Sequence, residues 1–108
     1  MNVSFLMTNQ VITASGSEPS PHSVIGDSLS VEVIVSAVSG TTPSATFSIQ
    51  WSSDGVNFAD ASPVDSFSPI TAVGNIVQRF NTKGLYYRLS WSVTGTAPSL
   101  TTTIEARN

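Results

Sequence analysis

The sequence predicts an all-β fold, a single antiparallel β-sandwich of about seven or eight strands. Charged residues make up only 10% of the chain, against about 25% in ordinary globular proteins, and serine and threonine replace them. Apolar and polar residues alternate along several runs, and this period of two is typical of strands that pack on one face. Turn signals built from Gly, Pro, Asn and Asp separate the runs about every ten residues.

The composition sets the size of the protein and excludes several classes of function. Residues 1–108 are long enough for one domain with one modest core. The net charge is −3 and the Lys and Arg residues are dispersed, so no nucleic-acid partner is expected. No run approaches the about 20 apolar residues of a membrane span, so no membrane is expected either. The first residues lack the basic region of a signal peptide, which predicts synthesis in the cytoplasm without general export.

The N-terminal segment, residues 1–25, is expected to form a strand or an arm and then a loop. Val3, Phe5 and Met7 recur at every second position, which predicts a strand with one mainly apolar face. Residues 15–22 combine Ser and Gly with prolines. This composition favours an extended loop over a helix, because proline cannot sit in a helix interior.

The clearest strand covers residues 29–38. Its apolar side chains recur at every second position, and we expect them to face the core: Leu29, Val31, Val33, Val35 and Ala37. The opposite side of this strand includes Ile34 and Val38 and is only partly polar. We therefore expect a loop or another subunit to cover that side.

Further strands are expected on either side of recognisable turns. Asp54-Gly55 is a strong hairpin signal between residues 47–51 and 56–59. The remaining strands are expected at residues 74–80, 85–93 and 100–106, the second with an inward stripe of Leu85, Tyr87, Leu89, Trp91 and Val93. Periodicity does not reveal strand order, so a jelly roll and an immunoglobulin-like sandwich both fit the pattern.

One phrase occurs twice in the chain, at residues 38–50 and again at residues 93–105, with Val, Gly, Thr, Pro, Ser and Ile at matching positions. Each copy lies between two strand-like runs, which predicts two long hairpins that turn at Gly-Thr-x-Pro-Ser. The turns are uncharged and compact, so Thr41, Thr42 and Thr96 are candidates for contacts with another protein, since few charges would lose their water.

The aromatic residues fit a packed core better than a binding site. Trp51 and Trp91 are in phase with core positions, although an aromatic platform for a sugar is the alternative. Tyr87 lies on the apolar stripe and fits a structural role like that of a tyrosine corner. Tyr86 is expected to point outward, which makes it a candidate interface residue.

No set of residues indicates catalysis, a metal or a cofactor. His22 is the only histidine and is expected to be exposed in its loop. Asp60 and Asp65 could share a calcium ion, but solvated loop acids are the preferred interpretation. Asp54 and its neighbours partly match the Asp-box turn of sialidase-type propellers, but a plain hairpin turn is the preferred interpretation. We therefore expect a protein that is not an enzyme, with no metal site and no cofactor.

Three phrases of the chain resemble small structural proteins of tailed bacteriophages. They are Val-Ser-Gly-Thr-Thr-Pro-Ser at residues 38–44, Gln-Trp-Ser-Ser-Asp-Gly-Val-Asn-Phe at 50–58, and Tyr-Arg-Leu-Ser-Trp-Ser-Val-Thr-Gly-Thr-Ala-Pro-Ser at 87–99. The resembled proteins are single β-sandwich domains of the virion, including capsid decoration, or cement, proteins. The resemblance covers roughly residues 29–108 and does not include the first 25 residues.

This resemblance implies a virion protein that binds the outside of the phage head and stabilises contacts between capsomers. It implies the major capsid protein or another virion protein as partner, and a homo-oligomer, with a trimer favoured. A tail, collar or fibre-associated module and a carbohydrate-binding sandwich are the alternatives. The residues expected to make these contacts are Val3, Phe5, Met7, Ile34, Val38, Thr41, Thr42, Tyr86 and Thr96.

Overall fold

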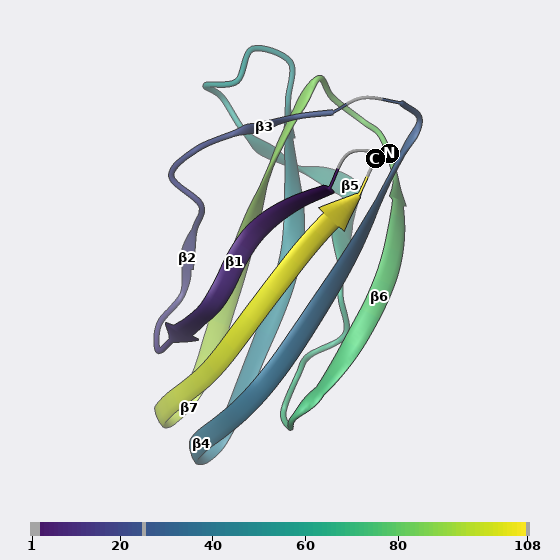
Figure 1. Cartoon of the computed structure of the whole chain (residues 1–108). Coiled ribbons are helices and arrows are strands. Elements are labelled where there is room, and N and C mark those ends of the chain that lie inside the picture. The colour runs from purple at the N-terminus through teal and green to yellow at the C-terminus, as the bar shows by residue number, and fades with distance from the viewer. Residues whose placement is uncertain (1–2, 25, 108) are drawn as a thin grey trace.

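The fold is all-β, as the sequence predicts, and every strand pairing is antiparallel. The structure is a computed structural model that describes residues 3–24 and 26–107. Its strands are β1 (Val3–Ile12), β2 (Gly16–Ser17), β3 (His22–Ser23), β4 (Ser28–Ser52), β5 (Ala59–Ser66), β6 (Gly74–Asn81) and β7 (Tyr86–Arg107) (Figure 1).

The two long strands, β4 and β7, form the centre of the fold. They pair along nearly their whole length, from Ser30 opposite Arg107 to Ser52 opposite Tyr86. Figure 1 shows that both strands turn back on themselves at the same end of the molecule. Each long strand therefore supplies one half to each of two sheets, in the way that corner strands switch sheets through bends.

The two sheets have the strand order of a jelly roll. The first contains β1, residues 99–107 of β7, residues 28–39 of β4, and β6, in that order. The second contains β2 and β3, then residues 86–94 of β7, residues 44–52 of β4, and β5. Strands that are neighbours in the first sheet are thus connected to strands that are neighbours in the second sheet. An antiparallel ribbon wound into two sheets in this way is a jelly roll and not an immunoglobulin-like sandwich.

The repeated phrase forms this shared bend and not two hairpins, so the hairpin prediction was wrong. The copies pair with each other, with Thr41 opposite Thr96, and the flanking arms of each copy lie in different sheets. Gly40 and Gly95 have φ values of 107° and 117°. A Cβ at Gly40 would lie 2.5 Å from the Ala97 carbonyl oxygen, and one at Gly95 would lie 2.8 Å from that of Thr42. The backbones of the two copies therefore require glycine at both positions.

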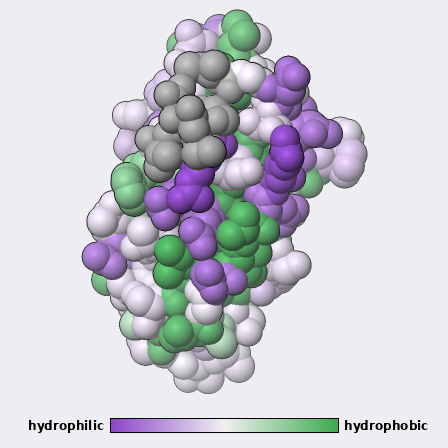
Figure 2. Space-filling model, turned by 45° about the vertical axis from the view of Figure 1, so that its right-hand side comes forward, coloured by the Kyte–Doolittle hydropathy of each residue, from purple (hydrophilic) through white to green (hydrophobic). Residues whose placement is uncertain are grey.

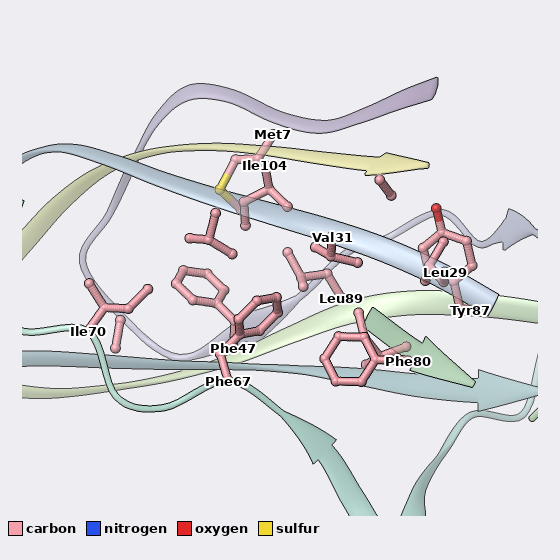
Figure 3. Packing of buried hydrophobic residues seen from close by; sticks show 14 of the residues in the cluster. Met7, Leu29, Val31, Phe47, Phe67, Ile70, Phe80, Tyr87, Leu89 and Ile104 are labelled. Atoms are coloured by element: carbon pink, nitrogen blue, oxygen red, sulfur yellow. The ribbon is translucent and has the colours of Figure 1, made fainter. Parts of the chain in front are cut away.

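The core lies between the two sheets and consists mainly of the expected inward stripes. Phe67 and Phe80 close one side of the core edge to face, with ring centroids 5.5 Å apart. Figure 3 shows these rings beside side chains from β4 and β7. The buried apolar residues are Met7, Ile12, Leu29, Val31, Val33, Val35, Ala45, Phe47, Ile49, Trp51, Phe67, Ile70, Phe80, Tyr87, Leu89, Leu100, Ile104 and Ala106.

Bulges reverse the expected side of several residues. The register of β1 shifts between Phe5 and Met7, so Phe5 is 63% exposed whereas Met7 is 4% exposed and lies in the core. The register of β4 shifts between Val35 and Ala37, and Val38 then packs against the core. One extra residue in a strand exchanges its two faces, so Met7 is a core residue and Val38 is partly buried against the core, and neither lies on the outer side as strict alternation predicts.

Candidate interaction surfaces

The outer side of the first sheet carries apolar and charged side chains together, and we call it the mixed face. One row of this face runs from Phe5 through Glu105 and Glu32 to Val77, across all four strands. Phe5 and Val77 are 63% and 64% exposed. The other members of the mixed face include Val11, Ser30, Ile34, Asn75, Arg79, Thr101, Thr103 and Arg107. Figure 2 brings the side with β6 forward and shows hydrophobic surface bordered by hydrophilic side chains.

Two glutamates stand directly opposite each other on the mixed face. Glu32 of β4 pairs in register with Glu105 of β7, and like charges in such a position destabilise a sheet. Arg107 lies 3.6 Å from Glu105, and the Asn75 amide donates to Glu32 at 3.2 Å. Arg107 thus lies near Glu105, whereas Glu32 is bonded to an uncharged amide, so a cation from outside the chain would be stabilised beside Glu32.

The outer side of the second sheet is different in chemistry, and we call it the hydroxyl face. A row of serines crosses it through Ser17, Ser90, Ser48 and Ser66. The hydroxyls of Ser48 and Ser90 are 3.0 Å apart. At the centre of this row the two hydroxyls therefore hydrogen-bond to each other and not to a partner.

The few charged groups of the hydroxyl face also have partners within the chain. The Arg88 Nε donates to the Gln50 amide oxygen at 2.8 Å, and the Gln50 amide nitrogen donates to Asp60 at 3.2 Å. The Arg88 guanidinium lies 4.7 Å from the centre of the Phe58 ring, in a cation–π arrangement. This chain of contacts holds the loop after β4 against the sheet.

The structure separates the residues that the sequence proposes as contacts. Phe5 and half-buried Ile34 lie on the mixed face. Thr41, Thr42 and Thr96 are exposed at the shared bend. Tyr86 is half-buried on the second sheet, beside Gly55, and Val3 pairs with Arg107 through its backbone, while its side chain lies outside the described residues. The proposed contacts therefore belong to several surfaces, and the sequence pattern missed Val77.

The N-terminal segment is part of the sandwich and does not extend from it. β1 pairs with β7 from Val3 opposite Arg107 to Ile12 opposite Leu100. The chain then crosses the second sheet, where the Ser15 hydroxyl accepts the Val93 N–H at 2.9 Å. An arm that reaches a neighbouring molecule is therefore not formed by β1 in this structure.

Both tryptophans have structural roles. The Trp51 Nε1 donates to Asp65 at 2.8 Å, and Lys83 lies 2.9 Å from the same carboxylate. The Trp91 Nε1 donates to the Ala14 carbonyl at 3.1 Å, and the Gly16 backbone lies against its ring. Trp91 also lines a shallow polar depression of about 220 Å³. Because Gly16 covers part of its ring, Trp91 offers a poor platform for stacking on a sugar.

The Asp54 loop is closed by its own carboxylate. Asp54 accepts hydrogen bonds from the backbone N–H groups of Val56 and Asn57, both at 2.9 Å, and from the Asn57 amide and the Ser52 hydroxyl, both at 2.8 Å. The backbone N–H of Asn57, followed by that of Val56, holds the pKa of this carboxyl far below its usual range. The carboxylate thus accepts the hydrogen-bond donors of its own turn, as expected for a plain hairpin turn.

His22 is not an exposed loop residue, contrary to expectation. Its ring lies 2.9 Å from buried Glu18 and stacks on Tyr87, with ring centroids 5.2 Å apart. The other oxygen of Glu18 accepts the Leu89 N–H at 2.8 Å, while the Glu18 N–H donates to the Leu89 carbonyl. The Glu18 carboxylate therefore replaces the backbone carbonyl that a continuous strand would supply, because the chain turns away at Pro19.

The described residues form neither a cluster of metal ligands nor a membrane-spanning helix. Within residues 3–24 and 26–107, no group of three or more His, Asp and Glu side chains is placed to hold a metal ion. In the same residues, no helix is long and apolar enough to cross a bilayer. Asp60 and Asp65 have different partners, Gln50 and the pair of Trp51 and Lys83.

Comparisons with protein-family models, curated proteins and solved structures found no match to this chain.

Proposed function

We propose that this chain is a non-enzymatic structural protein of a phage virion, a decoration protein that binds the outside of the head. In this proposal its partner is the major capsid protein, and the contact stabilises neighbouring capsomers. The mixed face carries the proposal, because it presents Phe5, Ile34 and Val77 between charged side chains. An apolar centre with a polar rim is the usual composition of a protein–protein interface.

Two other features support this assignment without deciding it. The phrases at residues 38–44, 50–58 and 87–99 resemble virion proteins, and they lie on the central strands and their loops. The jelly roll is used by viral capsid domains, but lectins and cupins use it as well. Because a fold hosts many functions, the surface and not the topology must be tested.

The first test is the copy number of the protein in particles purified from the organism that encodes it, measured by mass spectrometry against the major shell protein. Near one copy per shell subunit is the expected result for a decoration protein. Far fewer copies would assign it to the tail, collar or fibre instead. Absence from the particles would contradict every virion role, and a titration of tryptophan fluorescence with sugars would then test the carbohydrate-binding alternative.

Deletion of the N-terminal segment is a poor test of this function. Removing residues 3–12 takes away an edge strand together with Met7 and Ile12 of the core. Loss of binding would then follow from unfolding as readily as from a lost contact. Substitutions of exposed residues on the mixed face avoid this ambiguity.

A further inference from the structure

The four edges of the two sheets differ in how well they are protected against pairing with another chain. β1 has register shifts and a left-handed residue, Asn9, with φ of 45°. β2 and β3 are two residues long each, and Pro19 and Pro21 lie between them. β5 contains Pro63, and its register with β4 is interrupted. Bulges, prolines and short strands are the devices that natural proteins use to prevent edge pairing.

β6 has none of these devices. Its eight residues, Gly74–Asn81, pair with β4 without a register shift, from Ser28 opposite Asn81 to Val35 opposite Gly74. The strand contains neither proline nor lysine, and Val77 at its middle is 64% exposed. Among the described strands it pairs only with β4, and Figure 1 shows it at the side of the sandwich. A long, regular edge of this kind is a template for a further strand.

The hydrogen-bonding groups at the outer edge of β6 can be assigned from its register. The Thr82 N–H, one residue beyond the strand, donates toward β4 to the Asp27 carbonyl at 2.9 Å. Because N–H and C=O directions alternate along a strand, the odd-numbered residues direct theirs away from β4. The available groups are therefore those of Asn75, Val77 and Arg79.

We propose that two copies of this chain associate through antiparallel pairing of their β6 strands around a two-fold axis at Val77. Val77 then exchanges both backbone hydrogen bonds with Val77 of the second copy, and the two exposed side chains pack together. Asn75 of each copy stands opposite Arg79 of the other. This pairing is a property of the isolated protein and does not depend on the proposed function.

Charge complementarity favours a second copy over a foreign strand. In this register each Arg79 approaches the Asn75 of the other copy, whose amide is bonded to Glu32. The guanidinium thereby approaches the Glu32 carboxylate, which stands opposite Glu105 and is bonded to the uncharged Asn75 amide. The neighbouring two-fold registers, centred at Ile76 or Gln78, instead place Val77 opposite Asn75 or Arg79 and lose the apolar pair. Because the axis is normal to the sheet, the mixed faces of both copies point the same way.

Sedimentation velocity of the purified chain over a wide concentration range tests the proposal. The expected mass is twice the 11.3 kDa of one chain. Val77→Lys should give the single-chain mass, because the two lysines would lie directly opposite each other at the two-fold axis and repel. Val11→Lys is the matched control, because Val11 is 55% exposed on the opposite edge strand, and it should leave the dimer intact. A wild-type monomer up to the solubility limit, or a dimer that survives Val77→Lys, would overturn the proposal.

Two further variants test the register. Arg79→Glu should abolish the dimer, and the double variant Arg79→Glu, Glu32→Arg should restore it, whereas failure to restore it would overturn the assigned register. The chain contains no cysteine, so Val77→Cys can be treated with a short bis-maleimide, and a covalent dimer should form that Val11→Cys does not give. If the wild type is monomeric but Val77→Lys loses particle binding, self-pairing is wrong and β6 receives a strand of another protein.

Discussion

The mixed face and the hydroxyl face belong to the same two long strands, yet their outward side chains differ sharply. On the hydroxyl face, Ser48 and Ser90 bond to each other and Arg88 is engaged by Gln50. On the mixed face, Phe5 and Val77 are exposed and Glu32 opposes Glu105. The inward sides of both sheets carry buried apolar residues, so the two sheets differ mainly on their outer sides. The mixed face exposes apolar side chains beside the opposed glutamates, and binding is expected there.

The largest effect is expected from a change at the bend that joins the two faces. In Gly95→Ala, the new Cβ would lie 2.8 Å from the Thr42 carbonyl oxygen at a φ of 117°. We expect a loss of at least about 3 kcal/mol in the free energy of unfolding, measured with urea. Gly26→Ala is the control, because its φ is 99° but no atom lies within 4 Å, and it should cost only about 1 kcal/mol. Equal losses would show that the contact between the two copies of the phrase is unimportant.

The comparison of the faces is tested directly by placing the same charge on each. Ile34→Lys alters the mixed face and should weaken particle binding by about 2 kcal/mol, or roughly 30-fold. The fold should tolerate this lysine, because Glu32 and Glu105 lie nearby. Ser92→Lys puts the charge on the exposed hydroxyl face and should leave binding unchanged. Binding is measured by co-sedimentation, and the opposite pattern would exchange the roles of the two faces.

A smaller effect is expected at the edge of the second sheet, where the Glu18 side chain, in place of a strand carbonyl, accepts the Leu89 N–H. Glu18→Ala removes the acceptor of the Leu89 N–H and the partner of His22. Urea unfolding should show a loss of about 1–3 kcal/mol, because a buried donor is left without a partner. Glu18→Gln keeps an acceptor oxygen and should lose less. If both variants match the wild type, the carboxylate does not stabilise this edge.

The smallest effect is confined to alkaline pH. Burial, and secondarily the negative charge of Glu18, raises the pKa of Tyr87 well above its ordinary value of 10.0. The folded protein therefore keeps the phenol neutral while the unfolded chain ionises above pH 10, so stability is lost as pH rises. The slope is at most about 1.4 kcal/mol per pH unit. Tyr87→Phe should reduce this decline in urea midpoints above pH 10, and an unchanged decline would contradict a buried neutral Tyr87.

The sequence predicted the fold class and most of the core because both depend on local alternation. Leu29, Val31, Val33 and Val35 are fully or almost fully buried, and the stripe from Leu100 to Ala106 is buried too. The repeated phrase was misassigned because Gly and Pro specify a local bend but not which strand lies beside it. Met7 and Val38 were misassigned because a bulge has no clear sequence signal.

The candidate surfaces were less predictable than the fold. Ile34 was placed outward from alternation alone, and its position on the mixed face agrees. Val77 was missed because the face it joins forms only when β6 pairs with β4, far away in sequence. Glu18 was missed because a carboxylate that replaces a strand carbonyl depends on the path of the chain after Pro19.

The pairing of the last strand with earlier ones has a consequence for how the protein folds during synthesis. β1 and the first half of β4 both take their central hydrogen bonds from residues 99–107 of β7. The first sheet cannot close until those residues have left the ribosome, and contacts between residues so far apart in sequence form slowly because closing the intervening loop costs chain entropy. Until then the first half of β4 can pair only with β6. Until residues 99–107 have been made, the edge of β4 that pairs with them is exposed to misassociation.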